Sequence, residues 1–304
     1  MNKHQSRSPV VFGEVLFDAF DDQRVLGGAP FNVAWNLKGI GLTPLFITAV
    51  GDDPDGETVK FTMRRWGLDT SGVQTNPQRP TGVVHVELKA GQPSYQIQEN
   101  VAYDFVESIL PLELVEQCPL FYHGSLAFRS EINRGTIRQT QEILKCPRFL
   151  DINIRNPHFK EEWSESLLNG LDHLKLNSDE LALLCGKPSN SRPLRVEDEV
   201  EISKQCANIL RDRHGIRQFW ITMGDRGAMW IGEGEVSCFE RALPTSSTVD
   251  TVGAGDAFAA VVMEAIIMQR SPSEALHRGN RLAAKVCGIR GATTDDATFY
   301  HEGI

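Results

Sequence analysis

The sequence predicts an α/β fold in which helices flank both faces of an open, doubly wound, mostly parallel sheet. Short apolar runs rich in Val, Ile and Phe alternate with longer segments of helical periodicity from residue 9 onward. Of the 304 residues, 41% are hydrophobic and 23% charged, close to the average of globular proteins. Neither an internal repeat nor a long linker divides the chain. We therefore expect a single domain over residues 1–304.

Six short apolar runs bounded by polar or glycine residues predict the strands of the main sheet. They cover residues 10–16, 45–51, 120–124, 149–153, 173–177 and 218–224. Helical spacing of apolar residues predicts helices near 30–40, 56–66, 129–144, 161–170, 178–185, 197–213, 253–269 and 272–289. Residues 81–99 break the alternation. Their period-two pattern around Ala90-Gly91-Gln92-Pro93 predicts an antiparallel hairpin.

The charge balance argues against polyanionic partners. The chain has 31 Lys and Arg against 40 Asp and Glu, a net charge of −9, and no basic patch, so we expect no nucleic-acid binding. We find no export signal and no apolar run long enough to span a membrane, so we expect no membrane association and a cytoplasmic location. Six cysteines without a CxxC motif are typical of buried thiols in a reducing compartment.

Residues 248–266, TVDTVGAGDAFAAVVMEAI, carry the most informative motif. A polar approach containing Asp250 leads to a glycine-bearing turn at 253–255, and Asp256 then opens an apolar helix. Glycines let a backbone approach a ligand closely, and free N–H groups at a helix N-terminus attract anions. The motif therefore predicts a phosphate-sized anion site beside two carboxylates.

Two interpretations of Asp256 are open at this point. Aspartate is favoured as an N-cap or in the first turn, so this residue could serve the helix alone. That interpretation leaves the paired glycines and Asp250 without a reason. A carboxylate beside an anion site is what phosphoryl transfer to an alcohol needs, because the carboxylate takes the hydroxyl proton while N–H groups stabilise the moving phosphoryl group.

Motifs of other enzyme classes are absent. The chain has no GxxxxGK[ST] loop, no HRD and DFG set, no HExxH and no GxSxG. The dinucleotide fingerprint fails because Phe258 stands where its third glycine would be. Without a P-loop lysine in this acidic chain, we expect a nucleotide to be held by backbone groups and magnesium, with little help from lysines.

Two long segments resemble the signatures of one family. DTVGAGDAF (250–258) is similar to the C-terminal signature of the PfkB, or ribokinase-like, carbohydrate kinases, and residues 26–57, which begin LGGAPFNVAWNL, to their N-terminal signature. Three shorter landmarks follow in the expected order: DINIR (151–155), KLNSDE (175–180) and TMGDRG (222–227). The resemblance covers about residues 10–295. It implies a ribokinase-like fold and ATP-dependent phosphorylation of a sugar hydroxyl, and GGAPFNVA favours fructose.

Carried over position by position, the resemblance implies a role for each motif residue. Asp256 would be the catalytic base, with an anion hole formed by Gly253, Ala254 and Gly255. The sugar-contacting positions would be Asp18, Gly27, Gly28, Asn32 and Arg155. The nucleotide-binding positions would be Asn177, Glu180, Thr222, Gly224, Gly227 and Asn280.

The resemblance also implies ATP and Mg²⁺ as cofactors. Glu180 would hold Mg²⁺ through water, as a cation that keeps its hydration shell requires. Relatives bind K⁺ near the loop that begins at Asp250, so a monovalent cation is a further expectation.

Plain structural interpretations compete with some of these roles. Asp18 could be a solvated loop residue, since exposed aspartate is common. Asn177 and Glu180 could simply begin a helix as cap and first-turn residues. Asn280 could face solvent from the middle of a helix.

The short interval between Glu14 and Gly27 implies a reduced β lid. We expect about residues 16–27 and 81–105 to contribute it, mostly through the hairpin 81–99. A reduced lid leaves both a monomer and a homodimer open. The functional alternatives are a kinase for another sugar, a sugar acid or a nucleoside, or a catalytically silent sugar-binding regulatory protein on the same fold.

Overall fold

The computed structural model describes residues 8–301, apart from residues 21–22, 90–91, 108–117, 187–194, 235 and 245–247. For residues 86–89 and 92–95 it describes the backbone alone.

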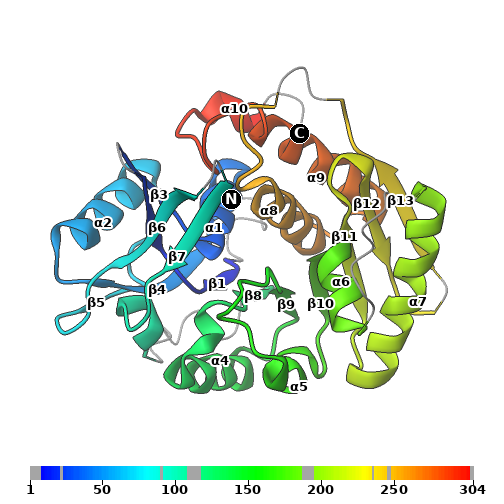
Figure 1. The fold of residues 1–304 in the computed structure, drawn as a ribbon, viewed down its shortest axis with the longest axis horizontal. Coiled ribbons are helices and arrows are strands. Elements are labelled where there is room, and N and C mark those ends of the chain that lie inside the picture. The colour runs from blue at the N-terminus through cyan, green and yellow to red at the C-terminus, as the bar shows by residue number, and fades with distance from the viewer. Residues whose placement is uncertain are drawn as a thin grey trace, which may run out of the picture.

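The main sheet has nine strands in the order β13-β12-β11-β10-β9-β8-β1-β4-β5 (Figure 1). The seven strands from β11 to β5 run parallel, while β12 and β13 are antiparallel to their neighbours. The strands are β1 (Val10–Phe12), β4 (Leu45–Gly51), β5 (Val73–Asn76), β8 (Phe121–Gly124), β9 (Arg148–Asp151), β10 (His173–Asn177), β11 (Gln218–Thr222), β12 (Gly227–Ile231) and β13 (Ser237–Arg241).

Two helical layers cover the two faces of this sheet (Figure 1). One layer contains α1 (Ala29–Gly39), α2 (Pro54–Trp66), α8 (Ala254–Ile267), α9 (Pro272–Val286) and α10 (Ala297–His301). The other contains α4 (Glu131–Leu144), α5 (Ser164–Leu168), α6 (Ser178–Leu184) and α7 (Val196–His214). Neighbouring residues of one strand enter opposite cores: Val11 packs in the first and Phe12 in the second. Strands covered on both faces are mostly apolar, which is why they appear as apolar runs in the sequence.

A second, smaller sheet has the order β3-β2-β6-β7. It consists of β3 (Arg24–Gly27), β2 (Leu16–Ala19), β6 (Gly82–Lys89) and β7 (Gln92–Ile97). The strands β2 and β6 run parallel, and the other two pairs are antiparallel. The short segment after β1 and the hairpin 81–99 therefore contribute two strands each.

The predicted fold class is confirmed, and each of the six predicted runs contains a strand of the main sheet. The run 10–16 is divided at Gly13, whose φ of +150° favours glycine and where a Cβ atom would lie 2.4 Å from Pro30 Cγ. The antiparallel hairpin is also confirmed, although Ala90 and Gly91 of its predicted turn lie outside the described residues. The expected helix 161–170 is wrong in extent: it is a short 3₁₀ turn followed by α5.

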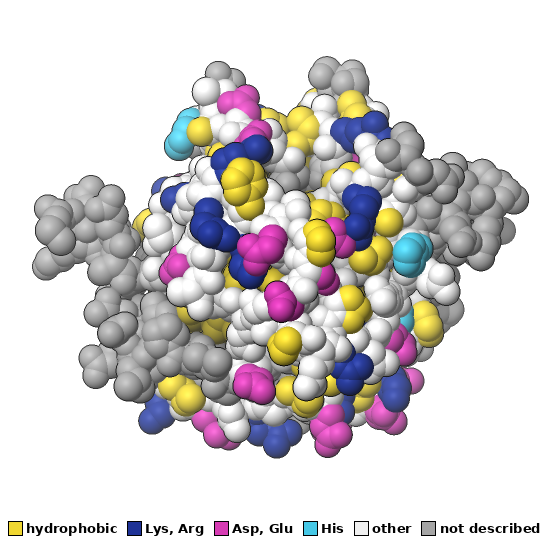
Figure 2. Space-filling view, turned by 90° about the vertical axis from the view of Figure 1, so that its left-hand side faces the viewer, with side chains coloured by type: hydrophobic (Ala, Val, Ile, Leu, Met, Phe, Trp, Pro, Cys, Tyr) yellow, Lys and Arg dark blue, Asp and Glu magenta, His cyan; other side chains and the backbone are white. Residues whose placement is uncertain are grey.

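The surface carries mixed charge. Figure 2 shows a face on which basic and acidic side chains are interspersed among hydrophobic and uncharged ones. Among the helices of the described residues, none combines the length and apolar character needed to cross a membrane.

Candidate functional site

The site residues lie where the carboxyl ends of the parallel strands meet the N-terminus of α8, the usual ligand position of open α/β sheets. The helix begins at the predicted turn, with Gly253 as N-cap at a φ of 78°. A Cβ atom at Gly253 would lie 2.3 Å from Ala292 Cβ, so both backbone conformation and space require glycine. Within the described structure, the N–H groups of Gly255 and Asp256 have no acceptor. The turn therefore offers free donors to an anion.

Asp256 lies in the first turn of α8 and is 8% exposed. Its Oδ2 accepts a 2.8 Å hydrogen bond from Asn32 Nδ2 in α1, which joins the two signature segments. Burial raises the pKa of Asp256, and the bond from Asn32 and the charges of Lys175 and Arg155 act against that rise. The N-cap is Gly253, so capping does not occupy this carboxylate.

Asn32 contacts Asp256, and the expected sugar-contacting aspartate and glycines lie on the adjoining strands β2 and β3 and at the start of α1. Asp18 projects from β2, and a Cβ atom at Gly27 of β3 would lie 3.2 Å from its Oδ2. Gly28 has a φ of +110°, and a Cβ atom there would lie 2.7 Å from the backbone oxygen of Glu14. Both glycines let β3 and the start of α1 approach the carboxylates closely.

Arg155 is exposed, and its positive charge acts to lower the pKa values of three carboxyl groups, those of Glu14, Asp18 and Asp256. For each carboxyl group, burial has a larger effect than the charge of Arg155. Burial raises the pKa of Asp18 to about 6 and the pKa of Glu14 to about 7. Asp18 is therefore not the solvated loop residue that the sequence also allowed.

Sequence reasoning did not assign Glu14 to the site. Its side chain is 4% exposed, and Oε2 has no hydrogen-bond partner in the described part of the chain. Its only sequence signal is its place directly after Gly13, where β1 has ended and the chain turns toward the second sheet.

A buried ion pair beneath the anion-binding turn was also missed. Lys175 Nζ donates to Asp151 Oδ2 at 2.9 Å and to Oδ1 at 3.1 Å, from paired positions of β10 and β9. A Cβ atom at Gly255 would lie 3.0 Å from this nitrogen. A lysine therefore lies next to this turn, while the expectation that lysines give a bound nucleotide little help stays a prediction.

Asn177 and Glu180 form a capping box at the start of α6. Asn177 Oδ1 accepts from Glu180 N–H at 2.8 Å, and Glu180 Oε2 accepts from Asn177 N–H at 2.8 Å. Glu180 Oε1 accepts from Ile154 N–H. The described residues contain no cluster of three metal-binding side chains. The Glu180 carboxylate keeps free lone pairs beside these bonds, so it fits a hydrated Mg²⁺ through water.

The remaining nucleotide candidates lie at the ends of β11 and β13. Thr222 ends β11, and Gly224 follows with a φ of +59° and open space where a Cβ would be. Packing alone requires a glycine at position 227, because a Cβ atom there would lie 2.1 Å from Glu240 O. Asn280 is 8% exposed and donates to the carbonyls of Glu240 and Arg241 at 3.2 Å, so it does not face solvent, the alternative that the sequence also allowed.

Asp250 shapes the loop that leads into the turn. Its Oδ1 accepts from Val252 N–H at 3.0 Å, and its Oδ2 from Gly291 N–H at 3.3 Å. The carboxylate therefore holds the loop against residue 291.

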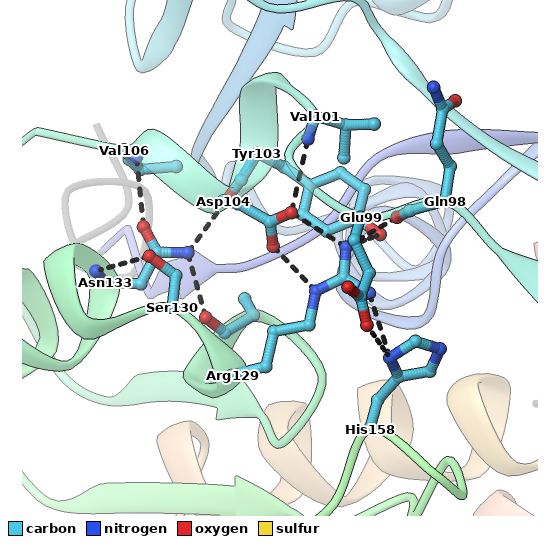
Figure 3. A network of polar contacts seen from close by, with 11 residues as sticks. Gln98, Glu99, Val101, Tyr103, Asp104, Val106, Arg129, Ser130, Asn133 and His158 are labelled. Carbon is cyan, nitrogen blue, oxygen red and sulfur yellow. Dashed lines mark hydrogen bonds and ion pairs between the residues drawn. The ribbon is translucent and has the colours of Figure 1, made fainter.

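A polar network fixes the end of β7 to the main body (Figure 3). Arg129 Nε and Nη2 donate to the two carboxylate oxygens of Asp104, each at 2.8 Å, and Nη2 also donates to Gln98 O at 2.7 Å. His158 Nδ1 lies 3.2 Å from a carboxylate oxygen of Glu99. The network thus connects the end of the second sheet with the segment that carries Arg155.

This fold and arrangement define a class: an α/β protein with free N–H groups at a helix N-terminus beside a buried carboxylate, an arrangement suited to phosphoryl transfer. Comparisons with known proteins are more specific. Residues 2–298 match the model of the pfkB family carbohydrate kinases. Fructokinase-1 of Oryza sativa subsp. japonica is 28% identical, and the match covers 93% of this chain and 89% of the relative.

Solved structures show the same fold. An Arabidopsis thaliana ribokinase complexed with ribose and ATP has a TM-score of 0.79 at 21% identity, covering 98% of both chains. A fructokinase from Vibrio cholerae O395 in a form with fructose, ADP and calcium has a TM-score of 0.76 at 19% identity, covering 98% of this chain and 99% of that one.

The chain belongs to the pfkB family of carbohydrate kinases. It is accordingly a phosphotransferase with an alcohol group as acceptor, on a ribokinase-like fold.

Proposed function

We propose that this protein uses ATP to phosphorylate a hydroxyl group of a small sugar, with fructose as the preferred substrate. The arrangement around Asp256 carries the proposal: a buried carboxylate, held by Asn32, lies beside free N–H groups of the α8 N-terminus. The fructokinase relatives, at 25–28% identity, support fructose. The ribokinase complexed with ribose and ATP supports ATP as the phosphoryl donor, and it leaves a sugar other than fructose as the alternative acceptor.

In this proposal Asp256 accepts the proton of the attacking hydroxyl. The turn formed by Gly253, Ala254 and Gly255 binds the transferred phosphoryl group, with the free N–H groups of Gly255 and Asp256 as donors that stabilise the developing charge. Asp18 accepts hydrogen bonds from sugar hydroxyls, and Arg155 contacts the sugar or a phosphate. Gly27, Gly28 and Asn32 complete the sugar site.

The proposed cofactors are ATP and Mg²⁺. Asn177, Glu180, Thr222, Gly224, Gly227 and Asn280 line the nucleotide side of this site. Glu180 holds Mg²⁺ through water, and the ion neutralises phosphate charge when bound. K⁺ near Asp250, a cytoplasmic location and the choice between monomer and homodimer stay predictions.

We also propose that the second sheet acts as a lid over the sugar. It carries Asp18 on β2, and its other end is fixed by the Arg129 network (Figure 3). A lid would exclude water, which otherwise competes with the sugar hydroxyl for the phosphoryl group.

A coupled assay of ADP release tests the proposal. Fructose, ribose, gluconate and adenosine are compared at equal concentration with ATP, in excess Mg²⁺ and in excess EDTA. We expect the highest kcat/KM with fructose and no turnover in EDTA. Preference for another acceptor would overturn fructose, and turnover in EDTA would overturn the magnesium role. A folded protein without turnover of any acceptor would indicate the catalytically silent alternative.

A further inference from the structure

A buried ammonium group lies directly against the anion-binding turn. Lys175 is 6% exposed and contributes two donors to the fully buried Asp151. A Cβ atom at Gly255 would lie 3.0 Å from Lys175 Nζ, closer than nine in ten real Cβ contacts. The glycine at this position therefore gives the ammonium room against the first turn of α8.

One donor of Lys175 is unused. An ammonium has three N–H groups, Asp151 accepts two, and the described residues supply no acceptor for the third. A buried charged donor without an acceptor is costly, so such a group is expected to have a partner in the working state of the protein.

Two positive charges converge at this turn. The N-terminus of α8 carries the positive end of the helix dipole, and the ammonium lies beside it. Burial alone would lower the pKa of Lys175, but the carboxylates of Asp151, Glu180 and Asp256 raise it, so the group is charged at neutral pH. A cation next to the positive end of a helix is favourable when an anion lies between them.

We propose that Lys175 is a further catalytic residue, whose third N–H donates to an oxygen of the phosphoryl group held at residues 253–255. The inference rests on the proposed kinase function, since the anion is taken to be the transferred phosphoryl group. In the step, the bond from the γ-phosphorus to its bridging oxygen breaks, ADP keeps that electron pair, and the sugar oxygen bonds to phosphorus. The hydroxyl proton goes to Asp256, and Lys175 keeps its protons throughout.

The test variant is Lys175→Met combined with Asp151→Asn. Lys175→Met alone would leave an unpaired buried carboxylate and could prevent folding, whereas the double variant removes both charges. Arg278→Met is the matched control, because it breaks a largely buried ion pair with Glu264 near the other end of α8, where Arg270 still pairs with Glu264.

We expect the double variant to melt near the wild-type temperature and to lose about 10²–10³-fold in kcat, as for removal of one oxyanion donor, with the control unchanged. Calorimetric titration with inorganic phosphate in MgADP gives a second readout, in which the double variant binds at least about tenfold more weakly. A wild type that binds phosphate but turns over no sugar, together with a double variant that binds phosphate more weakly, would reject the proposed function and keep this inference. The inference is overturned if the double variant keeps both kcat and phosphate affinity, or if the wild type shows neither.

A second inference stands on a different observation and does not depend on the kinase function. The Sγ atoms of Cys118 and Cys146 lie 3.5 Å apart, although the residues are 28 positions apart in the chain. Cys118 precedes β8 and Cys146 precedes β9, two parallel neighbours in which Phe121 pairs with Arg148. Both side chains are partly exposed; of the six cysteines only Cys206 is buried, so the expectation of buried thiols is wrong for the other five.

The pair is suited to oxidation. The Cys146 thiol donates to the Cys118 sulfur and lowers the pKa of Cys118, which favours the reactive thiolate. A disulfide needs an S–S distance of about 2.05 Å, so the sulfurs must approach by roughly 1.5 Å.

We propose that Cys118 and Cys146 form a disulfide on exposure to a low-molecular-weight disulfide such as oxidised glutathione. The Cys118 thiolate attacks one glutathione sulfur and releases the first glutathione thiolate. Cys146 loses its proton, attacks the Cys118 sulfur and releases the second. Two protein thiols are oxidised and one glutathione disulfide is reduced to two thiols, which balances the exchange.

The bond would form at the amino ends of β8 and β9, opposite the carboxyl ends that carry the candidate site, so kcat should not change. After incubation with oxidised glutathione, we expect mass spectrometry of unreduced digests to show a peptide linked through Cys118 and Cys146. Closing this loop should raise the melting temperature by about 5 °C, reversibly with dithiothreitol. Cys146→Ser should show neither effect. Glutathione adducts without the 118–146 link, or an equal temperature shift in Cys146→Ser, would overturn the proposal.

Discussion

Three carboxyl groups, those of Glu14, Asp18 and Asp256, are held where burial disfavours their charge. Burial raises the pKa of each, so the ligand-free protein is less stable at neutral pH than it would be with neutral side chains there. Such groups are expected where a ligand later supplies the missing hydrogen bonds.

Glu14 gives the clearest pH dependence. Its pKa is raised from 4.5 to about 7, so its stability contribution is fully present below pH 4.5 and is lost as the pH rises through 7. We expect Glu14→Gln to increase the free energy of unfolding by about 3 kcal/mol at pH 8, the equivalent of this shift, and by almost nothing near pH 4.5.

Urea denaturation of the wild type and Glu14→Gln at both pH values measures this difference. Because only the difference between the two proteins is compared, other titrating groups cancel. A Glu14→Gln protein that is less stable than the wild type at pH 8 would contradict the described environment of Glu14.

Asp18 separates sugar binding from nucleotide binding. Its carboxylate lies on β2 of the second sheet and would accept sugar hydroxyls, so Asp18→Ala removes contacts to the sugar alone. We expect the sugar KM to rise about 10- to 100-fold with the ATP KM within about twofold of wild type. Steady-state kinetics with each substrate varied in turn measures both. Equal losses for both substrates would place Asp18 in the scaffold.

The sequence reveals the site residues that belong to continuous motifs, such as the turn at 253–255 and Asp256. It could not reveal Lys175 as part of the site, because its meaning depends on a contact with Gly255, 80 positions away, and on its pairing with Asp151. The hydrogen bond between Asn32 and Asp256 joins residues 224 positions apart, so it too could not be predicted from the local sequence. Chemistry that arises from packing between distant segments has no local sequence signal.

At the scale of elements, the second sheet is where binding should change the protein most. Its strands come from two separate segments, and Arg129 fixes only the end of β7 (Figure 3). If this sheet closes over the sugar, its backbone should exchange hydrogen more slowly in the complex. Hydrogen exchange with and without saturating fructose should show added protection across residues 16–27 and 81–105.

Helix α7 serves as the internal control for this experiment, since it covers the main sheet and carries no candidate site residue. Unchanged exchange across both segments with a substrate that is turned over would count against the lid.

Elements with strong periodicity were predictable, whereas the two edge strands β5 and β13 and the interior strand β12 were not among the predicted runs. The fully buried strands appear as apolar runs, whereas β13 is half-buried along most of its length and β5 is partly exposed. Strands at the edge of a sheet have weaker patterns, because only one neighbour and part of one face fix their side chains. The helix α10 was missed because five residues are too few to establish a period.

At the scale of the whole molecule, the two hydrophobic cores share the strands of one sheet, so we expect them to unfold together. Four tryptophans lie in or against the first core, and Trp163 packs against the second. In a Trp163→Phe background, fluorescence therefore reports on the first core alone. Leu174→Ala changes the second core and should lower the free energy of unfolding by about 2–5 kcal/mol. The decrease should be the same whether unfolding is followed by fluorescence or by circular dichroism.

Two separate transitions, with fluorescence unaffected by Leu174→Ala, would show that the cores are independent and that the single-domain description is wrong.

In the proposed reaction Asp256 takes the proton of the sugar hydroxyl, and the variant Asp256→Asn removes this function while it keeps the shape of the side chain. Asparagine keeps the size of the side chain and an oxygen that can accept from Asn32, but it has no basic carboxylate. We expect kcat to fall by about 10²–10⁴-fold, while ATP binding and the melting temperature stay near wild type because no buried charge is left without a partner. An Asp256→Asn protein with wild-type kcat would contradict the account.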